Sequence, residues 1–352
     1  MRSKICLPLV SIIVTNYNYE KYIEECLNSI LTQTYNKIEC IIIDDKSTDS
    51  SIEVIKKFIS SHLNSNISFK LIESSKNKGQ LAGFIKGIKE AKGEFICFVD
   101  ADDVLLKDFV NIHIQTHFKY HMAFTSCQHI EIGSKSEIHS VYSKNIVKNG
   151  AQNEFEFDFL PFEELEKTFS IPECFDNIYC KRLPLREYPF GSWYWGPTST
   201  AMFRKNALEL FDTDETDEWR ICADAFLFNY AHLIGSSLLI YAPLTAYRRH
   251  LKNGSSKMQI NGNRNLLPPD VNERISYNFK ILHKSTYNLL KKQKDKFLGN
   301  IEQRGLSELV GDTLRILDIN TLKNFKQDIC ELAEENVYNC SLNIKEKLLK
   351  SK

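Results

Sequence analysis

Three aspartates lie close together at positions 100–103. One residue separates Asp100 from Asp102, and Asp103 follows directly. Carboxylates this close repel one another unless a cation lies among them. Helix capping explains one aspartate at such a place but does not require all three. The spacing therefore indicates a site for a hard divalent cation, with Mg²⁺ or Mn²⁺ the ions that prefer oxygen ligands.

A further carboxylate, Asp224, interrupts an apolar segment. Its neighbours are Ile221, Cys222, Ala225, Phe226, Leu227 and Phe228. An aspartate in such surroundings often has a raised pKa, which suits a general base. The alternative is an ordinary aspartate on the surface of a helix, and these residues alone do not decide between the two.

The elements that must position these carboxylates alternate along the first hundred residues. Apolar runs of strand length occupy 9–15, 38–45, 69–74 and 94–100. Helical spacing of apolar residues occurs over 20–33 and 50–61, and a third helix is expected to end near Ala91. Alternating strands and helices predict a doubly wound parallel sheet, which binds ligands at the carboxyl ends of its strands.

The residues just after each expected strand are therefore the candidates for a ligand site. They are Thr15 to Tyr17, Asp44 and Asp45, Glu73 to Gly79, and Asp100 to Asp103. No Gly-X-Gly-X-X-Gly follows the first strand, and the chain has no P-loop motif, so dinucleotide and P-loop sites are excluded. Phosphates must be held another way, and a hard divalent cation on the Asp-X-Asp oxygens can do this by bridging a diphosphate.

Composition describes an ordinary globular protein of 352 residues. It has 45 basic and 45 acidic side chains and a pI near 7.1, which argues against a protein that coats nucleic acid. No apolar run approaches the ~20 residues of a membrane-spanning helix, so we expect a cytoplasmic protein. The ten cysteines are expected to be mostly buried thiols. The row His113, His117 and His121 lacks the rest of a zincin motif and predicts a solvated or partly packed helix face.

Three segments carry a resemblance to a known family. They are LVSIIVTNYNYEKYIEECLNSILTQTY (9–35), IECIIIDDKSTDSS (38–51) and GEFICFVDADD (93–103). In order and spacing they resemble the nucleotide-sugar-binding half of glycosyltransferase family 2, which consists of inverting enzymes with a GT-A fold. The segments 195–211 and 218–256 look like the acceptor-side half of the same family.

The resemblance implies roles on the side of the nucleotide sugar. Thr15 and Tyr17 match positions that line the nucleobase pocket, and Asp45 matches the carboxylate that hydrogen-bonds the base or ribose. Asp100 and Asp102 match the metal and diphosphate positions. The remaining residues expected to contact the nucleotide sugar are Asn16, Lys78 and Ala101.

One departure from the family concerns phosphate binding. Many members carry Ala-Arg-Asn where this chain reads Ala82-Gly83-Phe84, so an arginine available to the diphosphate or sugar is missing. Lys78 and Lys86 are the candidates to replace it. The departure bears on the identity of the donor more than on the fold.

The second half of the resemblance implies a base and a further metal ligand. Asp224 matches the general base, although the glutamate that often precedes it is Ala223 here. His250 matches a histidine that completes the metal site or contacts phosphate, as an imidazole can do in its neutral or protonated form. The alternative for His250, and equally for Arg248 and Arg249, is a solvated basic turn.

An aromatic loop provides candidate contacts for the acceptor. Trp193, Tyr194 and Trp195 lie between Gly191 and Pro197, and aromatic faces stack on sugar rings. We expect Trp193, Trp195 and Asp103 to contact the acceptor. A hydrophobic anchor beneath a loop is nearly as good an explanation of the tryptophans.

The resemblance predicts an α/β architecture: a GT-A type Rossmann-like sandwich with a mostly parallel central sheet and a helical C-terminal extension. The catalytic domain is expected over 1–265, with a nucleotide-sugar half at 1–125 and an acceptor half at 126–265. Residues 266–352 are expected to form the helical region. Its lysines at 284, 291, 292, 294 and 296 favour a solvated helix, with contact to an anionic membrane as the alternative.

The expected function is an inverting transfer of a sugar from a nucleotide-diphospho-sugar, with a UDP-sugar favoured, to the hydroxyl of a glycan or lipid-linked acceptor in bacterial surface polysaccharide assembly. Mn²⁺ or Mg²⁺ is the expected cofactor and nucleic acid is not an expected partner. Peripheral contact with the inner face of the cell membrane and homo-oligomer formation stay open. The alternatives are a catalytically weak carbohydrate-binding protein of the same fold and a nucleotidyltransferase.

Overall fold

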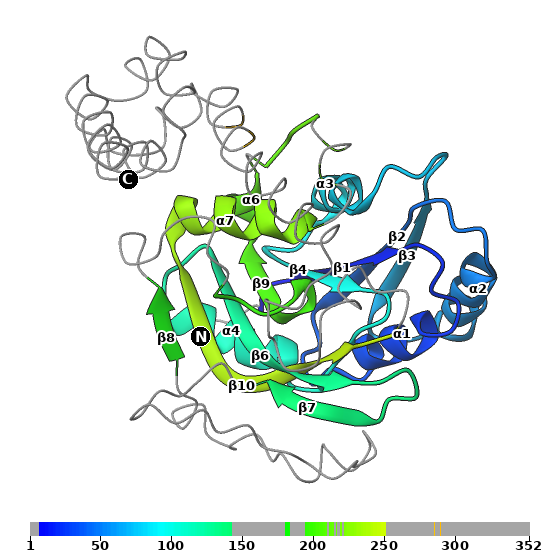
Figure 1. Cartoon of the computed structure of the whole chain (residues 1–352), viewed down its shortest axis with the longest axis horizontal. Helices are drawn as coiled ribbons and strands as arrows, with labels where there is room; N and C mark the ends of the chain where they lie inside the picture. Colours follow the sequence, from blue (N-terminus) through cyan, green and yellow to red (C-terminus); the bar gives the residue numbers. More distant parts are fainter. Residues whose placement is uncertain are drawn as a thin grey trace, which may run out of the picture.

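The computed structural model describes residues 7–142, 180–183, 194–209, 211–214, 216, 219, 222–250, 285 and 289. A ten-stranded sheet lies at the centre of this part, in the order β3-β2-β1-β4-β9-β6-β10-β5. The other two of the ten strands lie off this path, β7 paired with β6 and β8 paired with β10. Figure 1 shows the long strands β6 and β10 curving across one end of the sheet.

The first half of the sheet is parallel. It consists of β1 (Val10–Asn16), β2 (Ile38–Asp44), β3 (Ser68–Glu73) and β4 (Phe95–Asp100). β1 pairs with both β2 and β4, and β2 with β3, all in parallel register. The apolar runs of β1, β2 and β4 are buried, as expected for strands covered on both faces. These strands confirm the predicted parallel half.

The second half of the sheet is mixed. Its strands are β5 (Val104–Leu105), β6 (Phe124–Ile132), β7 (Ile138–Tyr142), β8 (Cys180–Leu183), β9 (Ala201–Arg204) and β10 (Ser237–Arg248). β9 runs antiparallel to its neighbours β4 and β6, whereas β6 and β10 are parallel. The predicted parallel character therefore holds for the first half, and antiparallel pairs add to it in the second.

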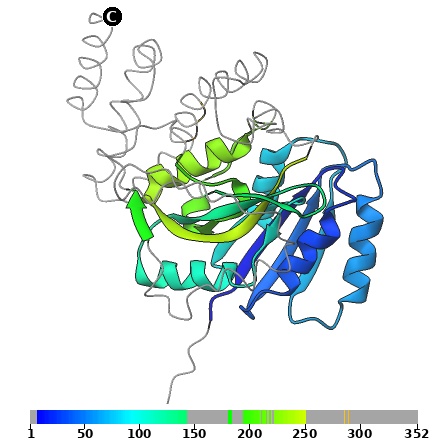
Figure 2. The same cartoon turned by 60° about the horizontal axis from the view of Figure 1, so that its bottom comes forward.

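Helices cover both faces of the sheet and give three layers. One face carries α1 (Ile23–Leu31), α2 (Ser51–Ser61) and α4 (Phe109–Lys119), whose apolar residues share one core cluster. The other carries α3 (Gln80–Glu90), α6 (Lys205–Leu208) and α7 (Ala223–Gly235) over a second cluster. Figure 2 shows α7 and α4 on opposite sides of the sheet. A short 3₁₀ helix, η2 (Thr198–Thr200), leads into β9.

Two histidines of α4 are buried, which corrects the expectation of a solvated or partly packed row. His113 Nδ1 lies 2.6 Å from Thr125 Oγ1, and His117 Nε2 lies 3.1 Å from the carbonyl oxygen of Met202. Burial lowers the pKa of both imidazoles, in His117 to about 3. They are therefore neutral packing residues at neutral pH.

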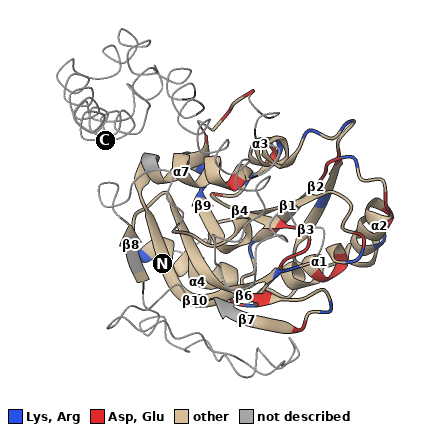
Figure 3. Cartoon of the chain, viewed as in Figure 1, with Lys and Arg blue, Asp and Glu red and all other residues tan. Residues whose placement is uncertain are grey.

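Charge lies mostly outside the sheet. Figure 3 shows acidic and basic residues on the outer helices and the connecting loops, while the central strands carry few of them. In the residues that the structure describes, no helix has the length and apolar character needed to cross a membrane. The predictions for Trp193 and for the lysine cluster fall outside the described residues, as does the region 266–352 apart from residues 285 and 289.

We predict that Gly87→Ala destabilises the protein although alanine favours helices. A Cβ at Gly87 would lie 2.4 Å from Cγ2 of the buried Ile13, so α3 approaches β1 too closely for a methyl group. Overpacking of this kind costs about 1–3 kcal/mol, against a gain of about 1 kcal/mol in helix propensity. Urea denaturation measures the net loss. Gly83→Ala is the matched control, because its nearest neighbour would be 3.1 Å away and the loss should be smaller. A Gly87→Ala protein more stable than wild type would contradict this packing.

Candidate functional site

Asp100 ends β4 in the middle of the site. Its Oδ1 accepts hydrogen bonds from Gln80 Nε2 at 2.7 Å and Thr15 Oγ1 at 3.5 Å, and its backbone N–H donates to Ser199 Oγ at 3.0 Å. Burial, followed by the negative charges of Asp102 and Asp224, raises the pKa of Asp100 to about 8, although the two hydrogen bonds oppose the shift. Asp224 therefore lies near enough to the strand-end carboxylates to interact with them.

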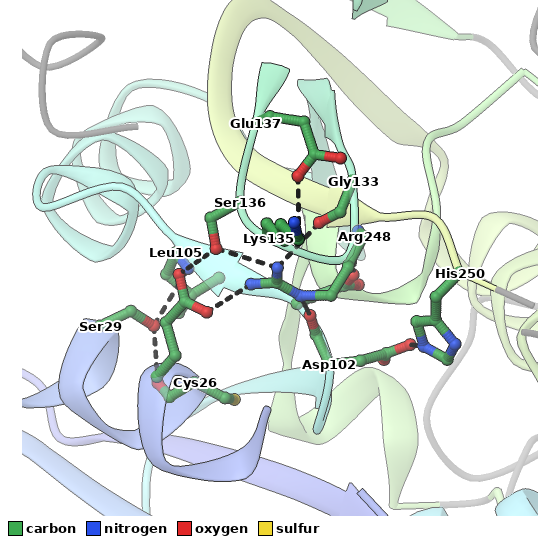
Figure 4. Close-up of polar contacts among 12 residues, drawn as sticks. Cys26, Ser29, Asp102, Leu105, Gly133, Lys135, Ser136, Glu137, Arg248 and His250 are labelled. Atoms are coloured by element: carbon green, nitrogen blue, oxygen red, sulfur yellow. Dashed lines mark hydrogen bonds and ion pairs between the residues drawn. The ribbon is translucent and has the colours of Figure 1, made fainter. Parts of the chain in front are cut away.

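Asp102 pairs with His250. His250 Nε2 lies 2.9 Å from Asp102 Oδ2, and the side chains are only 6% and 4% exposed. The imidazole stacks on Tyr22 with ring centroids 4.9 Å apart and meets the edge of Tyr19 at 5.8 Å. Burial, followed by the charge of Asp102, raises the pKa of Tyr19. Figure 4 shows the contact between Asp102 and His250, which joins the turn after β4 to the end of β10.

Asp103 lies inside the protein. It accepts hydrogen bonds from Ser199 Oγ at 2.6 Å and from the backbone N–H of Arg248 at 2.9 Å, and its side chain is fully buried. Burial and the neighbouring Asp102 raise its pKa. Asp103 thus connects the turn after β4 to η2 and β10 and has no surface through which to contact an acceptor.

The ends of β1 and β2 are held by a polar network. Asn16 Nδ2 donates to the buried Asp44 Oδ2 at 2.7 Å, and Ser47 donates to the same oxygen at 2.6 Å. Asp44 therefore orders the turn after β2, and Asn16 ties it to β1. Tyr17, the next residue, is 44% exposed, so its ring is accessible from the solvent.

Asp45 organises the loop that precedes α3. Its carboxylate accepts the backbone N–H of Lys78 at 2.9 Å and that of Gly79 at 2.7 Å. Gly79 has a φ of 84°, which a residue with a side chain rarely adopts. The side chain of Lys78 is exposed beside this loop. The arrangement shows a loop-ordering role for Asp45, and its contact with a nucleoside stays a prediction.

Asp224 lies in the first turn of α7. Cys222 has a left-handed backbone with φ of 58°, so the helix begins immediately after a sharp turn. The backbone N–H of Ala225 donates to Asp224 Oδ1 at 2.9 Å. Burial raises the pKa of Asp224 to about 6, although hydrogen bonds oppose the shift. At neutral pH the side chain is therefore mostly ionised and more basic than an ordinary aspartate, as suits a general base.

Trp195 packs in the core, contrary to the expectation of an acceptor platform. It is 3% exposed, its indole N–H donates to Ser237 Oγ at 2.9 Å, and its ring packs on Phe124 and Phe228. Burial of so large a ring stabilises the junction of β6 and α7. The alternative, a hydrophobic anchor beneath a loop, describes it better.

The two arginines after Tyr247 are both paired. Arg248 is 1% exposed and its guanidinium contacts Glu25 at 2.6 Å, whereas Arg249 contacts Glu131 at 2.6 Å. The alternative of a solvated basic turn is therefore wrong for Arg248. Its guanidinium is used within the protein rather than for phosphate.

The residues around Asp102 fit a divalent cation. In the described ranges, no group of three or more His, Cys, Asp and Glu side chains is already arranged to hold a metal. Asp102 and His250 form a pair of suitable donors. Burial and the neighbouring carboxylates raise the pKa of Asp100, and a cation would stabilise its ionised form. Mg²⁺ and Mn²⁺ sites commonly use one or two carboxylates and take their other ligands from phosphates and water.

Sequence reasoning missed several neighbours of these carboxylates. They are Gln80, Ser199, Tyr19 and Tyr22. Gln80 directly follows Gly79, the last of the candidate residues after the third strand, so its position in the sequence was a usable signal. Ser199 had no such signal, because a run of Ser and Thr close after a proline is common in loops.

A parallel half that ends in Asp-X-Asp, joined to a mixed half that brings Asp224 and His250 to the same place, defines a GT-A type α/β fold. Residues 11–179, slightly less than half of the chain, match the model of glycosyl transferase family 2.

Known glycosyltransferases align with different lengths of this chain. The chain is 28% identical over 246 residues to glycosyltransferase GlyA of Streptococcus pneumoniae, which covers 70% of this chain and 31% of that protein. It is 36% identical over 119 residues to an uncharacterized glycosyltransferase of Haemophilus influenzae, covering 34% and 46%. The chain thus matches about a third to a half of the length of these relatives. The crystal structure of S. aureus TarS 1–349 in complex with UDP aligns with a TM-score of 0.49 and 16% identity, over 98% of this chain and 92% of that one.

We predict that Asp45→Ala loosens the loop before α3. Removing a carboxylate that accepts two backbone N–H groups should lower the free energy of unfolding by about 1–3 kcal/mol. Hydrogen exchange at the amides of Lys78 and Gly79 should accelerate, and mass spectrometry measures it. Glu73→Ala is the control, because Glu73 makes only an exposed ion pair with Lys56 and should change little. Unchanged exchange at both amides would contradict the ordering role.

Proposed function

We propose that this protein is a metal-dependent, inverting glycosyltransferase that moves a sugar from a nucleotide-diphospho-sugar to an acceptor hydroxyl. The observation that carries the proposal is the electrostatic proximity of Asp224, whose pKa is raised to about 6, to the strand-end cluster that contains Asp100. A base and a diphosphate site that lie together are what a direct displacement at the anomeric carbon needs.

Asp224 acts as the base in this proposal. Its carboxylate takes the proton of the acceptor hydroxyl while the oxygen attacks the anomeric carbon. The bond between that carbon and the diphosphate oxygen breaks in the same step, and the electron pair leaves with the nucleoside diphosphate. One displacement inverts the configuration, so no covalent sugar intermediate on the protein is required.

The donor side uses the ends of the parallel strands. Asp102 and His250, with Asp100, are the residues proposed to hold the divalent cation. A bound Mg²⁺ or Mn²⁺ supplies neutralisation of the negative charge on the departing diphosphate. We assign the nucleoside to the neighbouring strand ends, with Thr15, Asn16, Tyr17, Asp45, Lys78 and Ala101 as its contacts.

The donor and acceptor are proposed at the level of class. A UDP-sugar is the favoured donor, and a glycan or lipid-linked glycan of a bacterial surface polysaccharide the favoured acceptor, since the relatives are bacterial glycosyltransferases. Trp193 is retained as a candidate acceptor contact. The rival functions are a catalytically weak carbohydrate-binding protein and a nucleotidyltransferase. Hydrolysis of a UDP-sugar to UDP and free sugar in Mn²⁺ distinguishes the proposal from both.

We predict that Asp224→Asn separates stability from activity. Transfer, or donor hydrolysis in the absence of acceptor, should fall ~10²–10⁴-fold, because the amide cannot accept the proton. The native pKa of about 6 lies above the ordinary value of 3.8, so ionisation of Asp224 costs folding free energy as the pH rises through 6. The variant should therefore be more stable at pH 8, by about 1–2 kcal/mol, with a smaller gain at pH 5.

Melting temperatures at the two pH values and initial rates test this pair of effects. Asp212→Asn is the control, because Asp212 makes an exposed ion pair with Lys89 and should keep its rate. Asp217 and Glu218, the competing carboxylates earlier in the chain, should tolerate amidation. A folded Asp224→Asn protein with a near-normal rate, or a Glu218→Gln protein that alone loses activity, would show that the base is assigned wrongly.

We predict that Asp102→Asn weakens nucleotide binding only when metal is present. The variant keeps the shape of the side chain but loses the charge that attracts the cation, so the affinity for UDP in Mn²⁺ should fall roughly 10–100-fold while the affinity in EDTA stays the same. Isothermal titration with and without Mn²⁺ measures both. Equal loss under the two conditions would exclude Asp102 as a metal ligand.

A further inference from the structure

A buried guanidinium joins four segments of the chain two residues before His250. Arg248 Nε donates to the carbonyl oxygen of Asp102 at 2.8 Å, and Nη1 donates to the carbonyl oxygen of Gly133 and to Ser136 Oγ, each at 3.0 Å. Nη2 contacts Glu25 Oε2 at 2.6 Å. Figure 4 shows Arg248 at the centre of these contacts, which reach the turn after β4, the β6–β7 turn and α1.

Asp102 is held at both its backbone and its side chain from the end of β10. Its carbonyl oxygen accepts from Arg248, and its carboxylate contacts His250. The two contacts lie two residues apart on a chain segment that also passes Tyr22. The guanidinium carbon of Arg248 lies 4.9 Å from the Tyr22 ring centre, and His250 stacks on the same ring. Any shift of Arg248 therefore changes the support of both members of the pair.

Glu25 closes this network from α1. One of its oxygens accepts from Arg248, and the other accepts from Ser136 Oγ at 2.8 Å. Ser136 has a left-handed φ of 62°, so the β6–β7 turn presents its hydroxyl to both partners. A planar guanidinium can donate in these three directions at once and lie against an aromatic ring, which a lysine ammonium cannot do.

We propose that Arg248, held by Glu25, is a positioning residue that sets the place of His250 beside Asp102. The expected effect of this positioning, on the strength of metal-dependent nucleotide binding, rests on the proposed function. Its geometric claim concerns this chain alone. Neither Arg248 nor Glu25 contacts the donor in this scheme, and both act through the pair that they support.

The first measurement needs no ligand. Diethyl pyrocarbonate modifies accessible imidazoles, and mass spectrometry of peptides quantifies its reaction with His250 relative to the exposed His121 of the same full-length chain. We expect modification of His250 to rise several-fold in Arg248→Lys and in Glu25→Gln. Glu131→Gln is the matched control, because it removes the carboxylate that pairs with the adjacent arginine, and it should leave His250 protected.

The second measurement is the ratio of UDP affinities with Mn²⁺ and with EDTA. We expect Glu25→Gln and Arg248→Lys to reduce this ratio roughly 10-fold or more, as the loss of residues that orient metal ligands does. A purely structural role would lower the melting temperature and leave the ratio unchanged. If Arg248→Lys does not fold, the milder Glu25→Gln decides.

The two measurements distinguish the two proposals. If modification of His250 is unchanged in the folded variants, or rises equally in Glu131→Gln, the positioning role is wrong. This conclusion does not depend on the UDP affinities. A wild-type protein whose UDP affinity ignores Mn²⁺ overturns the metal-dependent function, and the modification of His250 still decides the role of Arg248.

Discussion

Negative charge gathered at the carboxyl end of β4 is the constraint around which this half of the molecule is built. Asp100, Asp102 and Asp103 are within four residues of one another, and Asp224 approaches them from α7. Buried like charges raise one another's pKa and oppose folding unless each carboxylate finds donors. The surrounding structure supplies these donors one by one, and each comes from a different element.

The three neighbouring aspartates differ because their donors differ. Asp103 is enclosed by Ser199 and the backbone of Arg248, so it serves the fold. Asp100 receives only neutral donors and keeps a raised pKa. Asp102 faces His250. A row of identical side chains is thus divided into a connecting residue and two candidate ligands by the strands that arrive beside it.

Sequence reasoning predicted what depends on local pattern. The parallel strands follow from apolar runs, and α1 and α2 from helical spacing, because these elements are stabilised by neighbours within the same hundred residues. The antiparallel strands β5, β8 and β9 are short, and their pairing depends on contacts distant in sequence, so no periodicity marks them. The burial of Trp195 and Arg248 could not be predicted for the same reason. A tryptophan in a Gly/Pro loop and an arginine in a basic turn both look exposed until the tertiary structure encloses them.

Helix α7 and strand β10 follow one another without a long loop, and this arrangement has an evolutionary consequence. Asp224 lies at the start of this unit and His250 just beyond its end, while Asp100, Asp102 and Asp45 belong to the first third of the chain. Recombination that replaced residues 222–250 would exchange Asp224 and His250 together and would keep Asp45, Asp100 and Asp102. Under the proposed function, one such exchange would change the proposed base and one proposed metal ligand at once, while the carboxylates at the ends of β2 and β4 would be inherited unchanged.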